Sequence, residues 1–123
     1  ERVGHRRPVP SPGYGTINLA ILVEAGLSEA AMIEALTIAA EARTLAVLTA
    51  GIALPAGLAT GTGTDCIALA CDAGDMAYAG LHTDLGEALG RAVHDAVLAG
   101  ARDWVAAHGQ VPRDHAADCP AEA

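Results

Sequence analysis

Over residues 16–24, one set of alternate positions is uniformly aliphatic, and the other set is mixed and includes Asn18, Ala20 and Leu22. Every second place in this stretch holds an aliphatic side chain: Ile17, Leu19, Ile21 and Val23. Successive side chains of a β-strand point to opposite faces, so a period of two predicts a strand with one face buried. Gly26 follows as a turn signal and ends the predicted strand.

The pattern changes to that of a helix after Ser28. Serine is favoured as an N-cap, and Glu29 places a negative charge at the positive end of the helix dipole. Alanine-rich sequence continues to Gly51, so we predict a helix over 29–50. Its predicted core positions are Met32, Leu36, Ala39, Ala40 and Val47. A second, polar stripe is either a solvated face or a wall of a site: Glu34, Thr37, Glu41 and Thr44.

A glycine-threonine turn with the sequence TGTGTD leads into a second apolar run at residues 66–71, which is predicted as a buried strand. Residues 76–78 are predicted as a short further strand. Asp84 and Glu87 have the spacing of a capping box, so a second helix is predicted over 85–108. Its apolar stripe consists of Leu85, Leu89, Val93, Ala96, Val97, Gly100 and Trp104.

This order of elements predicts an α/β or α+β fold, a layered sheet with the two long helices, 29–50 and 85–108, packed on it. Residues 16–108 are expected to form a single domain. The proline- and glycine-rich residues 1–15 are predicted to be an extended lead-in, and the charged residues 109–123 a disordered tail.

Composition sharpens this picture of the core. The chain has 123 residues, the length of one domain, and 52% of them are hydrophobic. Phe is absent, and the chain has 1 Trp and 2 Tyr, so alanine and aliphatic side chains supply the core volume. Helices and strands are therefore expected to approach one another closely.

The charge pattern excludes two classes of partner. The net charge is −8, and the basic residues cluster only at Arg2, Arg6 and Arg7, so a nucleic-acid-binding surface is not predicted. Charged residues interrupt every long apolar stretch, so no membrane span is predicted. Three cysteines without a framework spacing favour a reducing compartment, and we expect a cytoplasmic protein.

The TGTGTD turn at residues 60–65 is the first candidate for chemistry. It offers backbone N–H groups and hydroxyls around the carboxylate of Asp65, an arrangement that can hold an anion or an amide oxygen. It lacks the GK[ST] ending of a P-loop, and Cys66 stands where a dinucleotide fingerprint needs glycine. A plain tight turn with Asx-type hydrogen bonding fits the pattern equally well.

His82 and Thr83 precede the second helix, where a histidine can act as an acid or base near neutral pH. The alternative is a surface histidine beside a threonine cap. Cys66 and Cys71 are expected to be buried and to point to opposite faces of one strand. A metal site built from them with His82 and His94 is therefore disfavoured, as is a catalytic cysteine.

The same residues resemble the adenosylcobinamide amidohydrolase family, the CbiZ-type enzymes of cobamide salvage. The matching blocks are GTINLAILVEAGLSEAAMIEAL (15–36), AAEARTLAVL (39–48), ATGTGTDCIALAC (59–71) and YAGLHTDLGEALGRAVHDAV (78–97). Their combination is more specific than any single block. Family members usually carry lysine where this chain has Arg43 and Leu81, and they have a comparable stretch before GTIN, so the chain resembles the C-terminal part of the family domain.

The resemblance implies hydrolysis of the amide that joins the corrin ring's propionyl arm to aminopropanol in adenosylcobinamide, which releases adenosylcobyric acid. The corrinoid is then a substrate, no cofactor is predicted, and dependence on a metal is left open. The alternative is a non-catalytic module or fragment that binds a corrinoid or its nucleotide loop. We expect a homodimer or association with a missing N-terminal segment.

The chemistry of amide hydrolysis suggests roles for the candidates. Asp65 or Glu41 would orient water, the 60–64 backbone and hydroxyls would stabilise the oxyanion, and His82 would protonate the leaving nitrogen. Alternatively, Thr62 or Thr64 would be a covalent nucleophile. The predicted substrate-binding residues are Thr16, Asn18, Thr60, Gly61, Thr62, Gly63, Thr64 and Thr83. No metal ligands are predicted.

Overall fold

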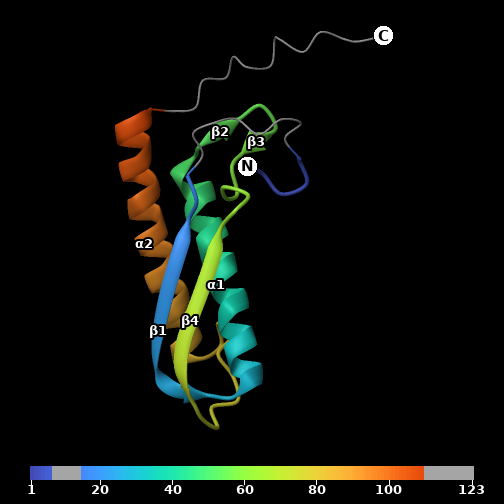
Figure 1. The fold of residues 1–123 in the computed structure, drawn as a ribbon, viewed down its shortest axis with the longest axis vertical. Helices are drawn as coiled ribbons and strands as arrows, with labels where there is room; N and C mark the ends of the chain where they lie inside the picture. The colour runs from blue at the N-terminus through green and yellow to red at the C-terminus, as the bar shows by residue number, and fades with distance from the viewer. Residues whose placement is uncertain (7–14, 110–123) are drawn as a thin grey trace.

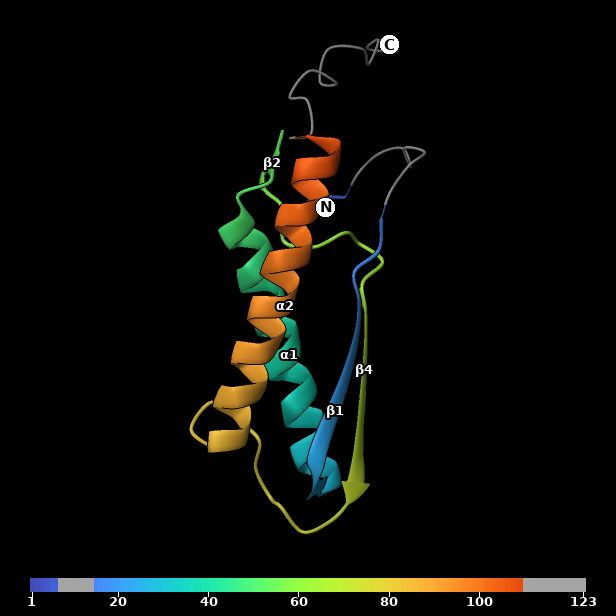
Figure 2. The same ribbon diagram turned by 90° about the vertical axis from the view of Figure 1, so that its left-hand side faces the viewer.

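The computed structural model describes residues 1–6 and 15–109. The elements are β1 (Asn18–Leu27), α1 (Glu29–Ala50), β2 (Ala53–Leu54), β3 (Gly57–Leu58), β4 (Cys66–Ala73) and α2 (Asp84–His108). The two helices pack on one face of a small sheet formed by β1 and β4 (Figures 1 and 2). The predicted layered fold is confirmed, and it is of the α+β type.

β1 and β4 pair in parallel, and α1 makes the crossover between them. Parallel strands need such a long connection because the chain must return to the starting end of the sheet. Asn18 pairs with Cys66 at one end and Leu27 with Ala73 at the other, with a bulge after Val23. β1 begins two residues later than predicted and ends three residues later, so Gly26 lies within the strand rather than ending it, and β4 ends two residues later than predicted.

Two details of strand structure differ from the prediction. Residues 76–78 do not form a strand, and Met76 makes only an isolated bridge with Leu27. The short antiparallel pair of β2 and β3 was not predicted, because two-residue strands are too short to show a hydrophobic period.

Both helices begin at hydroxyl caps. The Ser28 hydroxyl accepts a hydrogen bond from the N–H of Ala31, and α1 ends at Gly51 in the left-handed conformation, as the predicted helix requires. The predicted capping box at the start of α2 was wrong by one residue. Thr83 is the N-cap and accepts from the N–H of Gly86, which leaves Glu87 one position too late to complete a box.

The core between helices and sheet is built largely from alanine, which supplies half of the 14 buried hydrophobic residues in the described part of the chain. In α1 the predictions for Ala39 and Val47 were correct, whereas Leu36 is 37% exposed. The buried α1 residues are Ala31, Ala35, Ile38, Ala39, Ala42, Ala46 and Val47. The pattern misled because α1 approaches α2 through its smallest side chains rather than its largest ones.

The sheet has two unlike faces. Its inner face, toward the helices, carries Leu19, Ile21, Val23, Ile67, Leu69 and Cys71. Its outer face carries Asn18, Ala20, Leu22, Cys66, Ala68 and Ala70, all of them exposed. The prediction that both strand cysteines are buried was therefore wrong, because Cys66 lies on the outer face and is exposed.

Candidate functional site

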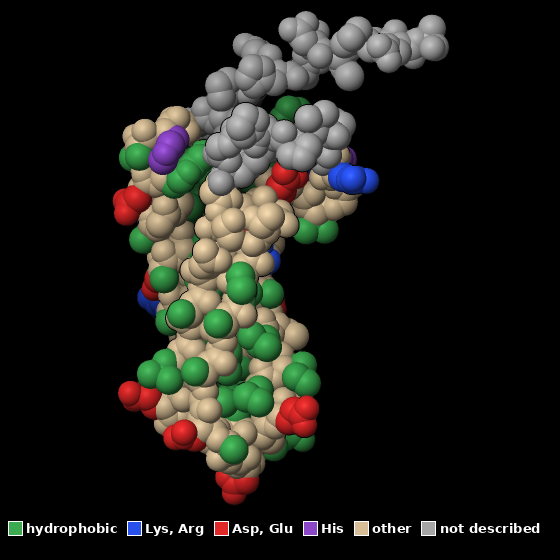
Figure 3. Space-filling model, in the orientation of Figure 1, with side chains coloured by type: hydrophobic (Ala, Val, Ile, Leu, Met, Phe, Trp, Pro, Cys, Tyr) green, Lys and Arg blue, Asp and Glu red, His purple; other side chains and the backbone are tan. Residues whose placement is uncertain are grey.

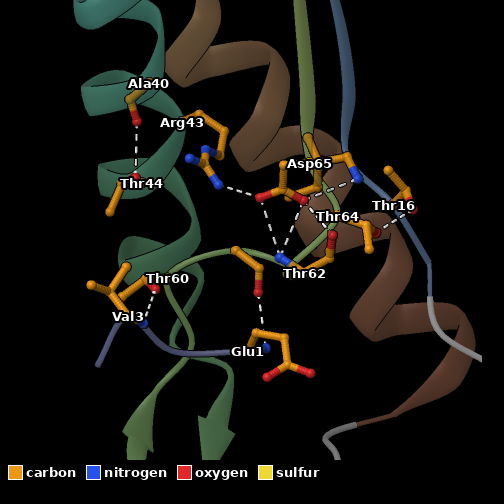
Figure 4. A network of polar contacts seen from close by, with 12 residues as sticks. Glu1, Val3, Thr16, Ala40, Arg43, Thr44, Thr60, Thr62, Thr64 and Asp65 are labelled. Atoms are coloured by element: carbon orange, nitrogen blue, oxygen red, sulfur yellow. Dashed lines mark hydrogen bonds and ion pairs between the residues drawn. The ribbon is translucent and has the colours of Figure 1, made fainter. Parts of the chain in front are cut away.

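Asp65 joins three elements at the end of the sheet where β1 and β4 begin (Figure 4). Its carboxylate, whose side chain is 8% exposed, accepts from the N–H of Ile17 at 3.3 Å and from the N–H of Thr62 at 3.1 Å. It also accepts from the Thr62 hydroxyl and pairs with the guanidinium of Arg43 from α1. The Asx-type turn that the sequence allowed is present, and it also anchors α1 and β1.

Arg43 is a site residue that the sequence reasoning missed. Its side chain is only 18% exposed, and its Nε atom is buried without a hydrogen-bond partner among the described residues. A Cβ at Gly61 would stand 2.4 Å from Asp65 Oδ2 and 2.5 Å from Arg43 Nη1, so a side chain there would displace the ion pair. The available signal was a lone cation among the alanines of α1, outside its predicted polar stripe.

The remaining hydroxyls of the turn are also bonded. The Thr60 hydroxyl accepts from the N–H of Val3 at 2.9 Å, and the Thr64 hydroxyl lies 2.7 Å from that of Thr16 (Figure 4). The amino group of Glu1 donates to the carbonyl of Gly61. Part of the predicted lead-in, residues 1–6, therefore packs along the turn, while residues 7–14 and the predicted tail after residue 109 lie outside the described residues.

An apolar cavity of about 510 Å³ lies beside the turn. This volume is within the range of small-molecule sites. Its walls come from α2, the end of α1 and the following β2: Val47, Ile52, Leu54, Ala96, Val97, Gly100, Ala101 and Trp104. Four predicted substrate-binding residues also line it, namely Thr16, Asn18, Gly61 and Thr62, whereas Thr60, Gly63 and Thr64 lie on the turn outside the lining.

His82 lies at the opposite end of the sheet from Asp65. Asp65 immediately precedes β4, and His82 follows it in the connection to α2 (Figures 1 and 2). The 8 residues of β4 span roughly 26 Å at the rise of an extended strand. Within one chain, Asp65 and His82 are therefore too far apart to act on the same bond of a substrate. Thr83, placed beside His82, is occupied as the N-cap of α2.

The carboxylate near His82 is Glu34 rather than Glu41. Glu34 accepts from the N–H of Ala79 at 2.7 Å, while Glu41 is exposed on α1. A Cβ at Gly80 would stand 2.7 Å from Glu34 Oε1 and 2.9 Å from His82 Nδ1, so these two side chains close over the glycine. Glu34 belongs to the predicted polar stripe, but only the fold shows that it, rather than the other three residues of the stripe, lies near His82.

Other titratable groups lie outside both clusters. On the surface of α2, hydrogen bonds from His94 and then Arg91 lower the pKa of Asp95. Residues 1–6 and 15–109 contain no group of three His, Cys, Asp or Glu side chains suited to hold a metal ion. Within the same residues, no helix has the length and apolarity needed to cross a membrane.

The chain is similar in sequence to a known protein family and to an uncharacterized protein. A family model described as adenosylcobinamide amidohydrolase matches residues 2–109. An uncharacterized protein of Methanocaldococcus jannaschii is 36% identical over 94 residues, which cover 73% of this chain and 37% of that relative. The chain thus spans little more than a third of the length of the relative it matches. No solved structure matches the chain.

Proposed function

Because the chain belongs to the adenosylcobinamide amidohydrolase family, we propose that it hydrolyses the aminopropanol amide of adenosylcobinamide. Water and adenosylcobinamide would give adenosylcobyric acid and aminopropanol. The observation that carries the proposal is the position of Thr62, which lines the apolar cavity while its hydroxyl donates to Asp65. A hydroxyl bonded to a carboxylate beside a cavity is suited to acyl transfer.

Substrate size decides how the cavity would be used. A corrin ring is too large to enter a cavity of about 510 Å³ inside a 123-residue chain. The propionyl–aminopropanol arm would enter, and the ring would lie across the opening. Thr16 at the cavity wall can bond a polar atom of the arm, while the wall of α2 contacts its carbon atoms.

Thr62 is better supported as nucleophile than Thr64. The Thr62 hydroxyl contacts a carboxylate, and Arg43 in turn orients that carboxylate, whereas the Thr64 hydroxyl pairs with Thr16. The nucleophile Thr62 thus contacts the base Asp65, and the base contacts the orienting group Arg43. This arrangement activates a weak nucleophile.

The proposed reaction has two steps. In the first, Asp65 accepts the hydroxyl proton of Thr62, and the Thr62 oxygen attacks the amide carbon. The C–N bond then breaks, and Asp65 passes the proton to the aminopropanol nitrogen. In the second, water attacks the carbonyl carbon of the ester on Thr62 and gives one proton to Asp65, the bond from that carbon to the Thr62 oxygen breaks, and Asp65 passes the proton to the Thr62 oxygen. Adenosylcobyric acid leaves with the oxygen of that water in its carboxyl group.

Gly63 and Thr64 follow Thr62 on the turn, outside the cavity lining, and their backbone N–H groups would serve the oxyanion at the edge of the cavity. The N–H groups of Gly63 and Thr64 have no hydrogen-bond acceptor among residues 1–6 and 15–109, and both residues are exposed. Donors held in place before the reaction stabilise charge as it develops. The proposal assigns no step to His82 or Glu41, because His82 is at the far end of β4 and Glu41 is exposed on α1.

The test is incubation of the protein with adenosylcobinamide and chromatographic detection of adenosylcobyric acid. Thr62→Val should lower turnover at least ~100-fold, the usual scale for loss of proton transfer or a nucleophile. Thr49→Val is the matched control, because its hydroxyl bonds only within α1. His82→Gln should retain turnover. Full activity of Thr62→Val would refute the assignment, and binding without product would instead support the non-catalytic module.

A further inference from the structure

The β1–β4 sheet is open on three sides in the described part of the chain. Each strand has a single neighbour strand, so each has one edge without a partner strand, and Met76 bonds only to the carboxyl end of β1, at Gly26 and Ser28. The outer face defined above is also uncovered, and Leu22 at its centre is 73% exposed. Figure 2 shows both helices on the other side of the strands.

Such a sheet is physically incomplete. Parallel strands occur almost only in sheets that are covered on both faces, and two strands alone are marginal in stability. Proteins that leave an edge exposed protect it with charges or proline. Residues 18–23 of β1 and 66–71 of β4 contain neither, and the two strands carry charge only toward their carboxyl ends, at Glu24 and Asp72. In Figure 3, which looks onto the outer face, hydrophobic side chains and backbone fill the centre, and charged side chains lie toward the border.

We propose that the outer face and a free strand edge form an interface that receives β-strands from the remainder of the family polypeptide. Strands fit because the edge offers backbone hydrogen bonds, which a helix cannot use. The small side chains of Ala20, Ala68 and Ala70 also allow a second layer to approach closely.

The source of these strands follows from the relative. The matched stretch makes up only 37% of the Methanocaldococcus jannaschii protein, so the greater part of that polypeptide is available to supply them. The family domain is then composite, with this chain contributing the two helices and the parallel pair. The proposal does not depend on the amidase reaction.

Cys66 provides a native probe, because its thiol lies on the outer face while Cys71 faces the helices. We label this chain alone with a maleimide and measure the rate at each cysteine from its peptide. In the folded chain, Cys66 should react within about tenfold of its rate in the chain unfolded by guanidinium chloride, and Cys71 should react markedly more slowly than Cys66. Light scattering should report a monomer. Protection of Cys66 that grows with protein concentration would overturn the proposal in favour of a second copy, and protection at every concentration would show that this chain covers its own face.

The second arm uses the whole Methanocaldococcus jannaschii relative with one cysteine placed at the position aligned with Cys66. We expect labelling at least ~100-fold slower there than at Cys66 of this chain, because a covered strand opens only by local unfolding. The matched control is a cysteine at the position of Ala99, exposed on α2, in both proteins. Equal labelling of the two outer-face cysteines would overturn the proposal, whatever the result of the amidase assay.

Discussion

Replacing Asp65 by Asn tests whether the carboxylate holds the site end of the sheet together. The exchange removes the charge that faces Arg43, and both side chains are largely buried, at 8% and 18% exposure. An Asn retains one acceptor oxygen, which cannot serve Thr62, Ile17 and Arg43 together, and its NH₂ group would face their donors. Removing one partner of a buried ion pair costs about 3–5 kcal/mol, and because Arg43 is 18% exposed we expect a loss at the lower end of that range.

This loss is large relative to the total stability of a small domain, which is about 5–15 kcal/mol. With a urea m value of about 1–3 kcal/mol/M, the unfolding midpoint should fall by roughly 2 M. The assay is urea unfolding followed by circular dichroism at 222 nm and by fluorescence of Trp104, the single tryptophan. If Asp65→Asn already unfolds the chain without urea, the dichroism records that as the larger loss.

Two variants make this test specific. Asp72→Asn, at an exposed position of β4, should change stability little. The double variant Asp65→Leu with Arg43→Met removes both charges and should lose less stability than Asp65→Asn, because no buried guanidinium is left without its partner. The reasoning fails if Asp65→Asn unfolds within about 1 kcal/mol of the wild type.

Three further predictions concern α2. Gly86→Ala should destabilise the chain by more than about 1 kcal/mol in urea unfolding, because its Cβ would stand 2.0 Å from a backbone carbonyl oxygen. The control is Gly100→Ala, which should not destabilise the chain because open space surrounds Gly100. Thr83→Ala removes the N-cap and should cost about 1 kcal/mol in the same assay. His94→Ala should raise the pKa of Asp95 toward its ordinary value in an NMR titration; an unchanged pKa would contradict the assigned cause. Because the folded pKa is lowered, the stability gained from this contact is present at neutral pH and is lost as pH falls through the folded pKa.

Much of the local structure was predictable because it depends on near neighbours in the chain. Ser28 caps a helix with the N–H three residues later, and Gly51 ends the same helix through its own positive φ. The alternation of Leu19, Ile21 and Val23 is likewise local, and it identified the inner face of β1. The core stripe of α1 was less predictable, since closeness to α2 determined which positions were buried.

The candidate site was only partly predictable for the same reason. The TGTGTD turn identified Thr62 and Asp65, whose contact spans three residues. Arg43 was missed, because nothing local connects a residue in α1 with a carboxylate on the turn. The cavity was also missed, because its walls come from elements distant in sequence.

The sequence by itself determined the order of strand and helix, the caps, the turn and its resemblance to a family of amidohydrolases. Only the tertiary structure decided which candidates lie together. Parallel pairing of β1 with β4 brings Ile17 to Asp65 across 48 positions, yet it sends His82, much nearer in sequence, to the other end of the sheet. Strand direction is a property of the assembled sheet, and no pattern within a single strand encodes it.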